Sequence, residues 1–342
     1  MEDEADSREL ARLLSPRSSV SLEDLARRAQ AVTARKFGRT ISLYVPLYLS
    51  NFCSGGCVYC GFAADRSIPR KRLTFDEVKT ELAALKTMGF EDVLLLTGER
   101  GGQADFDYVA ECVALAAKVF HRVTIETFPM SVEEYRVLAQ AGCTGVTVYQ
   151  ETYDTVQYER LHRWGPKRDY FARLDAPARA LEAGMRSVGM GVLLGLAEPA
   201  ADVQALCRHV RFLERQFWRA GFSISFPRVR PQEGGFTPAF PVSDRELARI
   251  VFSFRLCLPD IELVLSTREQ AGFRDGLAGV GISKMSIASR TTVGGYGSEK
   301  EDRSGQFRVG DERNVATFCA ALKSRGLEPV FKNWDSVYRE IC

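Results

Sequence analysis

The sequence lacks the features that would place the protein in a membrane, on nucleic acid or outside the cell. No apolar run in its 342 residues approaches the length needed to cross a bilayer. Lys and Arg number 46 against 44 Asp and Glu, so no basic field exists to attract nucleic acid. The N-terminus, Met1-Glu-Asp-Glu-Ala-Asp6, is acidic, whereas a secretory signal begins with basic residues. We therefore expect a cytoplasmic protein without membrane or nucleic-acid partners.

Two further absences reduce the number of fold classes and metal sites that the sequence can form. No Gly-rich dinucleotide turn follows any predicted strand, which disfavours an open doubly wound sheet. The stretch Gly294-Gly-Tyr-Gly297 has no strand-to-helix setting and is interpreted as a turn. No second pair of Cys or His residues accompanies the one cysteine-rich loop, although a structural zinc site needs four protein ligands. The six scattered cysteines are best interpreted as packed thiols in a reducing compartment.

The cysteine-rich loop itself, Ser50–Phe62, carries Cys53, Cys57 and Cys60, with three glycines that give it flexibility. Three thiolates on one short loop suit a metal centre. A four-iron cluster held by only three cysteines leaves one iron open to a small chelating molecule. Disulfide partners, buried thiols and chance spacing are the alternatives. The lack of a secretory segment and the glycines in the loop favour the cluster.

The rest of the chain alternates between strand-like and helix-like segments. Eight strands are predicted, over 41–49, 92–97, 122–127, 145–150, 186–194, 223–226, 262–266 and 283–288. Helices are predicted over 7–14, 21–36, 74–88, 105–120, 131–141, 169–183, 201–220 and 243–257, near Phe273, and over 311–325. Regular alternation of this kind indicates parallel strands with crossover helices, and eight strands fit a closed (β/α)8 barrel of the TIM type.

Three regions of the chain follow from this pattern. We expect an N-terminal helical extension over 1–38, the barrel over 39–290 and a C-terminal extension packed on the barrel over 291–342. The composition shows no clean boundary between them and no internal repeat.

In a parallel barrel the residues that follow each strand share one mouth. Charged residues recur at these positions, which favours a site for zwitterions, because Arg pairs with a carboxylate and Glu with an ammonium. The predicted mouth comprises the cysteine loop, Thr97–Glu99, Glu126, Thr127, Tyr149–Glu151, Tyr153, Pro227, Arg228, Arg230, Ser266–Glu269, Ser286 and Ser289. Arg228 and Arg230 either line the site or pair within the barrel.

Several stretches together resemble the 2-iminoacetate synthases, the tyrosine lyases of thiamine biosynthesis, within the aromatic amino acid lyases of the radical S-adenosylmethionine (SAM) enzymes. The cysteine spacing, with Tyr59 before the last cysteine, is the signature of the whole superfamily. The narrower resemblance lies in Tyr44–Asn51, Cys60–Phe62, Leu96–Glu99, Val148–Tyr153, Ser225–Pro231, Leu265–Glu269 and Lys332–Asp335. It spans about residue 9 to the C-terminus.

One departure is informative. The related lyase of hydrogenase maturation carries a second cysteine cluster at its C-terminus. The tail of this chain has only Cys319 and Cys342, far apart in sequence. The comparison speaks against a second cluster, and against release of carbon monoxide and cyanide.

The resemblance implies a radical SAM (β/α)8 barrel with N-terminal helices and a C-terminal helical cap. It implies one 4Fe–4S cluster on Cys53, Cys57 and Cys60, with SAM on the open iron. An electron from a flavodoxin or ferredoxin would cleave SAM to methionine and a 5′-deoxyadenosyl radical. Attack on the amine of L-tyrosine would break its Cα–Cβ bond, giving p-cresol and 2-iminoacetate for thiazole synthase. Tryptophan or another aromatic amino acid is the alternative substrate.

The resemblance also assigns residues to the two small molecules. The residues assigned to SAM are Glu99 for the methionine ammonium, Arg173 for its carboxylate, Tyr59 beside the adenine, and Glu126, Gln150 and Glu151 near the ribose. Those assigned to the substrate are Arg268 for its carboxylate, Ser286 or Ser289 beside it, and Tyr48 at the same mouth.

Overall fold

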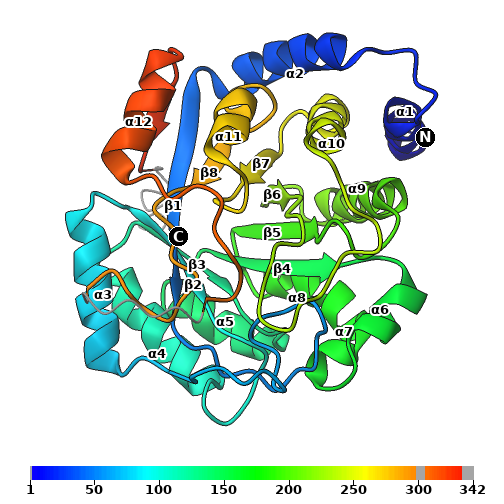
Figure 1. The fold of residues 1–342 in the computed structure, drawn as a ribbon. Coiled ribbons are helices and arrows are strands. Elements are labelled where there is room, and N and C mark those ends of the chain that lie inside the picture. The colour runs from blue at the N-terminus through cyan, green and yellow to red at the C-terminus, as the bar shows by residue number, and fades with distance from the viewer. Residues whose placement is uncertain (1, 298–304, 333–342) are drawn as a thin grey trace.

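Eight parallel strands close into a barrel in the computed structural model, which describes residues 2–297 and 305–332 (Figure 1). The strands are β1 (Thr40–Tyr48), β2 (Asp92–Leu96), β3 (Arg122–Glu126), β4 (Gly145–Glu151), β5 (Ser187–Val192), β6 (Gly221–Ser225), β7 (Glu262–Leu265) and β8 (Lys284–Ser286). They lie in the order β2-β3-β4-β5-β6-β7-β8-β1, and pairing of β1 with β2 closes the ring. The predicted barrel is confirmed.

Helices surround the barrel, and several begin at capping boxes. Thr74, Ser131 and Ser243 each accept a hydrogen bond from the backbone of a Glu three residues on, whose carboxylate bonds back. The helices are α1 (Glu2–Leu14), α2 (Leu22–Phe37), α3 (Phe75–Thr87), α4 (Phe106–Ala117), α5 (Val132–Gln140), α6 (Thr155–Leu161), the 3₁₀ helix η1 (Pro166–Arg168), α7 (Tyr170–Leu174), α8 (Ala176–Glu182), α9 (Pro199–Gln216), α10 (Asp244–Cys257), α11 (Ala271–Leu277) and α12 (Val315–Ser324). Among these residues no helix is long and apolar enough to cross a membrane.

The predicted helix over 169–183 is two helices, α7 and α8, that meet at Asp175. Pro177 in the first turn of α8 explains the break, because proline has no backbone N–H and its ring clashes with the carbonyl four residues earlier. Helices α6 and η1 fall in a stretch for which no element is predicted.

A ninth strand, β9 (Glu328–Val330), is also absent from the predicted pattern. It pairs in parallel with Thr40–Ser42 of β1. Because Ser42 pairs with β8 on its other edge, β9 occupies the edge that β2 takes further along the strand. The first barrel strand therefore also holds the C-terminal region. Cys342 and the stretch Asn333-Trp-Asp335 lie outside the described residues.

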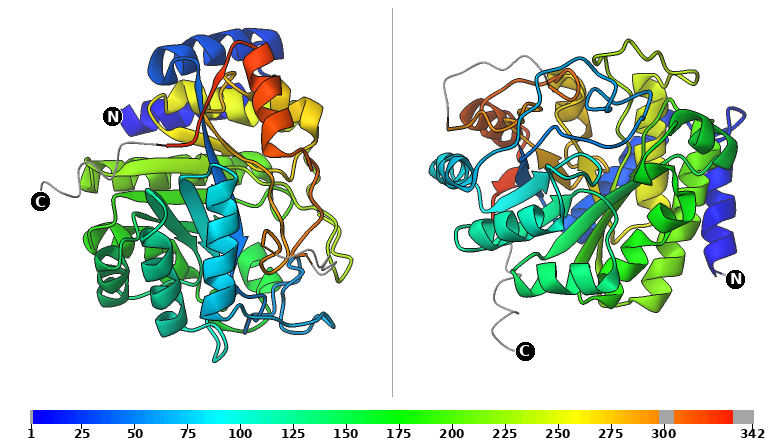
Figure 2. Two further views of the ribbon diagram at one scale, coloured as in Figure 1. Left: turned by 90° about the vertical axis from the view of Figure 1, so that its left-hand side faces the viewer. Right: turned by 90° about the horizontal axis from the view of Figure 1, so that it is seen from below.

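The carboxyl ends of the strands and the cysteine loop lie at the same end of the molecule. In the left view of Figure 2 this loop is at the opposite end from α2. Helices α1 and α2 pack against α9 and α10 on the outside of the barrel. The N-terminal helices therefore support the scaffold, and the polar mouth is left to the loops that follow the strands.

The segment after β8 is tied to the barrel by the buried carboxylate of Glu81 in α3. Its oxygens accept hydrogen bonds from the backbone N–H groups of Gly295 at 3.1 Å, Tyr296 at 2.6 Å and Gly297 at 3.1 Å. Gly294 and Gly295 have φ angles of 69° and 94°, which glycine adopts without steric cost. The stretch interpreted as a turn is thus a nest of backbone donors around an anion.

We expect Glu81→Ala to lower the free energy of unfolding by about 3 kcal/mol, because three backbone donors lose a charged acceptor. Urea unfolding of the cluster-free chain measures the change. Glu111→Ala, at an exposed position on α4, is the control and should stay within about 0.5 kcal/mol. Equal unfolding curves for the two variants would show that Glu81 does not anchor this segment.

Candidate active site

The cysteine loop lies against the carboxyl ends of β1 and β2. Cys57 is buried, whereas Cys53 and Cys60 are partly exposed. Backbone N–H groups of Gly55 and Glu99 each donate to the sulfur of Cys53 at 3.4 Å. A Cβ built at Gly55 would lie 3.7 Å from the sulfurs of both Cys53 and Cys57, so a side chain at this position would be in contact with both thiols.

The three thiols do not converge on the site of a single ion. No three His, Cys, Asp or Glu side chains within 2–297 and 305–332 lie close enough to hold a single metal ion. In an iron–sulfur cluster each thiolate binds a different iron, so wider spacing is needed. Burial raises the pKa of Cys53 and raises that of Cys57 to about 12. The thiols therefore hold their protons until a metal displaces them.

A second segment, residues 161–168, packs on the cysteine loop, and we name it the clamp segment. The N–H of Gly56 donates to the carbonyl of Trp164 at 3.0 Å, and Cys57 pairs with His162 in an antiparallel bridge. A Cβ at Gly56 would lie 2.4 Å from the ring of Trp164. Glycine at this position therefore permits close packing of the clamp segment.

His162 of the clamp segment fixes the ring of Tyr59. The distance from Tyr59 Oη to His162 Nε2 is 2.7 Å, as is that from His162 Nδ1 to the carbonyl of Tyr158. Because a carbonyl only accepts, Nδ1 carries the proton and Nε2 accepts from the tyrosine hydroxyl. Burial lowers the pKa of His162 to about 3, so the ring stays neutral. Tyr59 is thereby held at the edge of the mouth.

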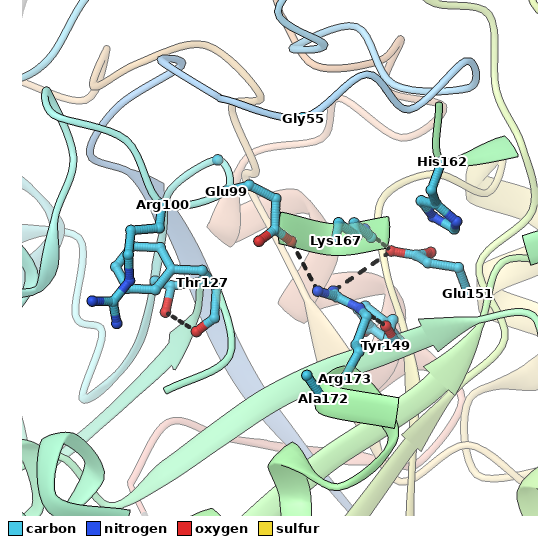
Figure 3. A network of polar contacts seen from close by, with 12 residues as sticks. Gly55, Glu99, Arg100, Thr127, Tyr149, Glu151, His162, Lys167, Ala172 and Arg173 are labelled. Atoms are coloured by element: carbon cyan, nitrogen blue, oxygen red, sulfur yellow. Dashed lines mark hydrogen bonds and ion pairs between the residues drawn. The ribbon is translucent and has the colours of Figure 1, made fainter. Parts of the chain in front are cut away.

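Four charged side chains form a buried network beside the loop (Figure 3). Arg173 Nη1 donates to Glu99 Oε1 at 2.9 Å, and its Nε donates to the carbonyl of Tyr149 at 2.7 Å. Lys167 Nζ donates to Glu151 Oε1 at 2.5 Å, and Arg173 Nη2 lies 3.9 Å from the same oxygen. Glu99 Oε2 is buried and has no hydrogen-bond partner among the described residues.

The charges in this network fix its protonation. Burial alone would raise the pKa of Glu151, but the ammonium of Lys167 and the guanidinium of Arg173 lower it below its usual value. Burial and Arg173 would lower the pKa of Lys167, yet Glu151 and other nearby anions raise it. Both groups are therefore ionised at neutral pH. Glu126 differs: burial, together with the charge of Glu151, raises its pKa to about 7.

A cavity at the mouth brings most of the predicted site residues together. Its lining includes Tyr48, Tyr59, Cys60, Glu126, Glu151, Arg268, Ser286 and Ser289, together with Tyr44, Tyr149, Lys167 and Arg230. The guanidinium of Arg268 lies 3.4 Å from the ring centroid of Phe307. Ser286 Oγ accepts from the N–H of Thr267 at 3.2 Å, whereas Ser289 Oγ is buried without a partner among the described residues.

Gln306 links this cavity to the cysteine loop. Tyr48 Oη donates to Gln306 Oε1 at 2.8 Å, and Gln306 Nε2 lies 3.7 Å from the sulfur of Cys60. The hydroxyl of Tyr48 donates to the amide oxygen, and the amide nitrogen is thereby directed at Cys60. No sequence signal points to Gln306, because it lies 246 residues from Cys60 in a stretch without regular structure.

Several residues predicted at the mouth do not line this cavity, Gln150, Tyr153 and Arg228 among them. Gln150 faces away from the cavity, since it alternates with Tyr149 and Glu151 on β4, and its amide donates to the carbonyl of Tyr170 at 3.4 Å. The hydroxyl of Tyr153 contacts His209 of α9 at 2.8 Å. Neither side chain lines this cavity, and the place predicted for Gln150 near the ribose stays a prediction.

Arg228 is the third. It forms ion pairs with Glu269 and Asp244 and does not line the cavity. Arg230 lines the cavity and also forms an ion pair, with its Nη2 2.6 Å from Oε2 of Glu269. The sequence left open whether these arginines line the site or pair within the barrel. Both form ion pairs within the barrel, and Arg230 also lines the cavity.

Two family models and several known proteins match this chain. Residues 47–210 match the model of the radical SAM superfamily, and residues 225–328 match the biotin and thiamin synthesis associated domain. The chain is 42% identical to 2-iminoacetate synthase of Escherichia coli K12, over 95% of this chain and 86% of that protein. It is 40% identical to the Salmonella typhimurium 2-iminoacetate synthase, over 96% of this chain and 87% of that protein.

Among solved structures, HydG, a maturase of the [FeFe]-hydrogenase, aligns with a TM-score of 0.91 and 30% identity. The alignment covers 98% of this chain and 77% of HydG. The fold of the whole described chain therefore matches a radical SAM barrel.

The raised pKa of Glu126 predicts a pH-dependent effect of Glu126→Gln on stability. An acid whose pKa rises from 4.5 to about 7 on folding stabilises the fold fully below about pH 4.5, and this contribution is lost as the pH rises to about 7. Glutamine does not ionise, so the variant keeps its unfolding free energy over this pH range. From about pH 5 to about pH 8 the variant should gain about 2 kcal/mol in unfolding free energy over the parent.

Urea unfolding of the cluster-free chain at both pH values checks this prediction. Glu133→Gln, whose side chain is 79% exposed, is the control and should show no such gain. A gain independent of pH would contradict the raised pKa.

Proposed function

Because this chain belongs to the 2-iminoacetate synthase family of radical SAM enzymes, we propose that it cleaves the Cα–Cβ bond of L-tyrosine to 2-iminoacetate and p-cresol. The superfamily works with a 4Fe–4S cluster and SAM. The observation that carries the proposal is the meeting of three cysteines and the half-paired carboxylate of Glu99 at one barrel mouth.

Cys53, Cys57 and Cys60 hold the cluster in this proposal. Glycine at position 55 keeps a side chain away from the sulfurs of Cys53 and Cys57, and backbone N–H groups already point at Cys53. Hydrogen bonds to sulfur tune the potential of such clusters, and the amide of Gln306 adds one to Cys60. When bound, the cluster and SAM supply a carbon-centred radical by one-electron reductive cleavage of the sulfonium.

The methionine end of SAM fits the buried charge network. The unpaired Oε2 of Glu99 accepts from an ammonium, and Arg173 beside it offers a guanidinium to the carboxylate. Glu151, held by Lys167, offers a carboxylate to hydroxyl groups, and the fixed ring of Tyr59 offers an apolar face. The protein thus presents opposite charges in the order that an amino acid requires.

The substrate occupies the other side of the cavity. Arg268 binds its carboxylate, with Ser286 and the unpartnered hydroxyl of Ser289 nearby. Contact with the ring of Phe307 restricts the guanidinium to one orientation. Glu126 can exchange a proton with a bound group near neutral pH. Enclosure at the barrel mouth limits the other C–H bonds that a reactive radical could reach.

Two partners complete the proposal. A flavodoxin or ferredoxin supplies the electron that reductive cleavage of the sulfonium requires. Thiazole synthase accepts 2-iminoacetate, because a free imine hydrolyses in water.

Anaerobic turnover after iron and sulfide reconstitution tests the function. With dithionite, SAM and L-tyrosine the enzyme should form 5′-deoxyadenosine, p-cresol and glyoxylate, the hydrolysis product of 2-iminoacetate. Cys57→Ala should lose the cluster absorbance and all turnover, whereas Cys319→Ala on α12 should keep both. Cleavage of tryptophan in place of tyrosine would reassign the substrate, and no 5′-deoxyadenosine from a fully loaded enzyme would refute the lyase.

Arg268→Ala should uncouple the reaction. We expect the ratio of p-cresol to 5′-deoxyadenosine to fall about tenfold or more, because a charged pair with the substrate carboxylate is lost. Chromatography of both products measures the ratio. Arg245→Ala, at an exposed position on α10, should leave it unchanged. An Arg268→Ala enzyme with normal coupling would exclude this role for the residue.

A further inference from the structure

The charged side chains that line the cavity differ in whether the protein itself pairs them. Glu151 accepts from Lys167 at 2.5 Å, and Arg230 Nη2 lies 2.6 Å from Oε2 of Glu269. These groups are already neutralised in pairs. Two other charged side chains of the cavity, one acidic and one basic, have no partner of opposite charge within 2–297 and 305–332.

The acidic one is Glu126, the last residue of β3. No residue in the described part of the chain donates a hydrogen bond to its carboxylate. Burial and the charge of Glu151 raise its pKa to about 7, although the charge of Arg268 opposes this rise. Because an unpaired carboxylate is costly to bury, a cationic ligand beside Glu126 would stabilise its ionised form.

The basic one is Arg268, in the loop that follows β7. Its guanidinium lies against the ring of Phe307, 3.4 Å from the centroid, and pairs with no carboxylate of the described residues. Strands β3 and β7 are four steps apart round the closed barrel in either direction, so the two side chains come from opposite walls. A ligand between them meets a cation on one side and an anion on the other.

This arrangement matches the charges of an α-amino acid. The carboxylate and the ammonium are attached to the same carbon, so the ammonium lies close to Arg268 once the carboxylate binds there. Glu126 is then the carboxylate that remains for it, since Glu151 is held by Lys167. A phenol lies at the far end of the substrate and carries no charge, so it compensates a buried carboxylate less well than an ammonium does.

We propose that Glu126 is the general base of the reaction: its carboxylate binds the substrate ammonium and accepts one proton from it. The inference rests on the proposed function, because the substrate must be an amino acid. One N–H bond breaks, its electron pair stays on the nitrogen, and the proton forms an O–H bond on Glu126. A neutral amine and a carboxylic acid result, and no electron is exchanged with another group.

The transfer prepares the amine for the cleavage step. Removal of a hydrogen atom from a neutral amine, followed by Cα–Cβ cleavage, leaves a neutral imine, whereas an ammonium would leave a protonated one. Enclosure favours the transfer, because burial disfavours both the carboxylate and the ammonium. A base whose pKa lies near neutral is also suited to this role.

Titratable and charged side chains act on Glu126 from β1, β4, the clamp segment, α7 and the loop after β7. They are Tyr44, Tyr48, Tyr149, Glu151, Lys167, Arg173 and Arg268. Burial raises the pKa of the three tyrosines, so their hydroxyls stay protonated. The arginines stay charged, and Glu151 and Lys167 are both ionised at neutral pH. Glu126 is therefore the member of this set that titrates near neutral pH.

The pH dependence of turnover tests the proton transfer. Because the base must be ionised to accept a proton, kcat/KM for p-cresol formation should rise with pH and level off above about pH 7. Glu126→Gln keeps a hydrogen-bond acceptor but cannot take the proton, so kcat should fall about 100-fold and this rise should disappear. Glu133→Gln, whose side chain is 79% exposed, should keep the rate and the profile of the parent.

Equilibrium binding tests the contact with the ammonium. The enzyme is loaded with cluster and SAM and kept without reductant, and two ligands are titrated: L-tyrosine, and 3-(4-hydroxyphenyl)propanoate, which lacks the amine. The parent should prefer the amino acid, and this preference should fall about tenfold or more in Glu126→Gln, because a charged hydrogen bond is lost. The affinity for SAM and the preference for L-tyrosine over L-phenylalanine should not change.

An undiminished preference for the amino acid in Glu126→Gln would overturn the proposal, as would a pH profile equal to that of the parent. Weaker SAM binding with unchanged tyrosine binding would instead assign Glu126 to the ribose, and a changed preference between tyrosine and phenylalanine would assign it to the phenol. Binding is read without turnover. An enzyme that binds tyrosine and forms no p-cresol therefore refutes the proposed function and leaves the binding result on Glu126 standing.

Discussion

The buried ion pair between Glu99 and Arg173 joins two elements that lie 74 residues apart in the chain. Burying charges without partners costs several kcal/mol for each ion, so each of the two holds the other in place. Glu151 and Lys167 extend the pair into a network of two carboxylates and two cations. The ends of β2 and β4, the clamp segment and α7 are thereby fixed relative to one another. Glu99 uses only Oε1 in this network. Its Oε2 stays free to accept a hydrogen bond from a ligand.

The shape of the cysteine loop comes from its neighbours as much as from its own sequence. Its glycines were expected to give flexibility, yet the structure shows tight packing against them. Gly56 lies under the ring of Trp164, and a Cβ at Gly61 would lie 2.4 Å from the carbonyl of Gln306. Two segments far along the chain therefore hold the loop from opposite sides. A loop fixed before metal arrives loses less conformational entropy when the metal binds.

The sequence predicts the parts of this molecule that follow from local pattern. All eight barrel strands appear within a few residues of their predicted positions, because each is a short apolar run between turn signals. The missed elements are short, such as the seven residues of α6 and the three of β9, and depend on packing or on pairing with β1. The pair of Lys167 with Glu151 and the contact of Gln306 with Cys60 depend on the folded chain, which no local pattern reveals. Gln150 does not line the cavity although Tyr149 and Glu151 do, because adjacent residues on a strand face opposite sides.

The net charge of the whole chain is close to zero, yet charged residues are held differently inside the mouth and on the surface. Inside the mouth, each cation of the network lies beside a carboxylate, since unpaired charge is costly where water is excluded. On the surface around the clamp segment, arginines also lie beside carboxylates, Arg163 beside Asp65 and Arg168 beside Glu159, but water and salt screen these pairs. A near-zero net charge excludes a strong long-range electrostatic field of one sign around the protein, but it does not describe how charges are arranged locally. The buried pairs of the mouth are therefore held more firmly than the exposed pairs of the surface, which contribute little to stability.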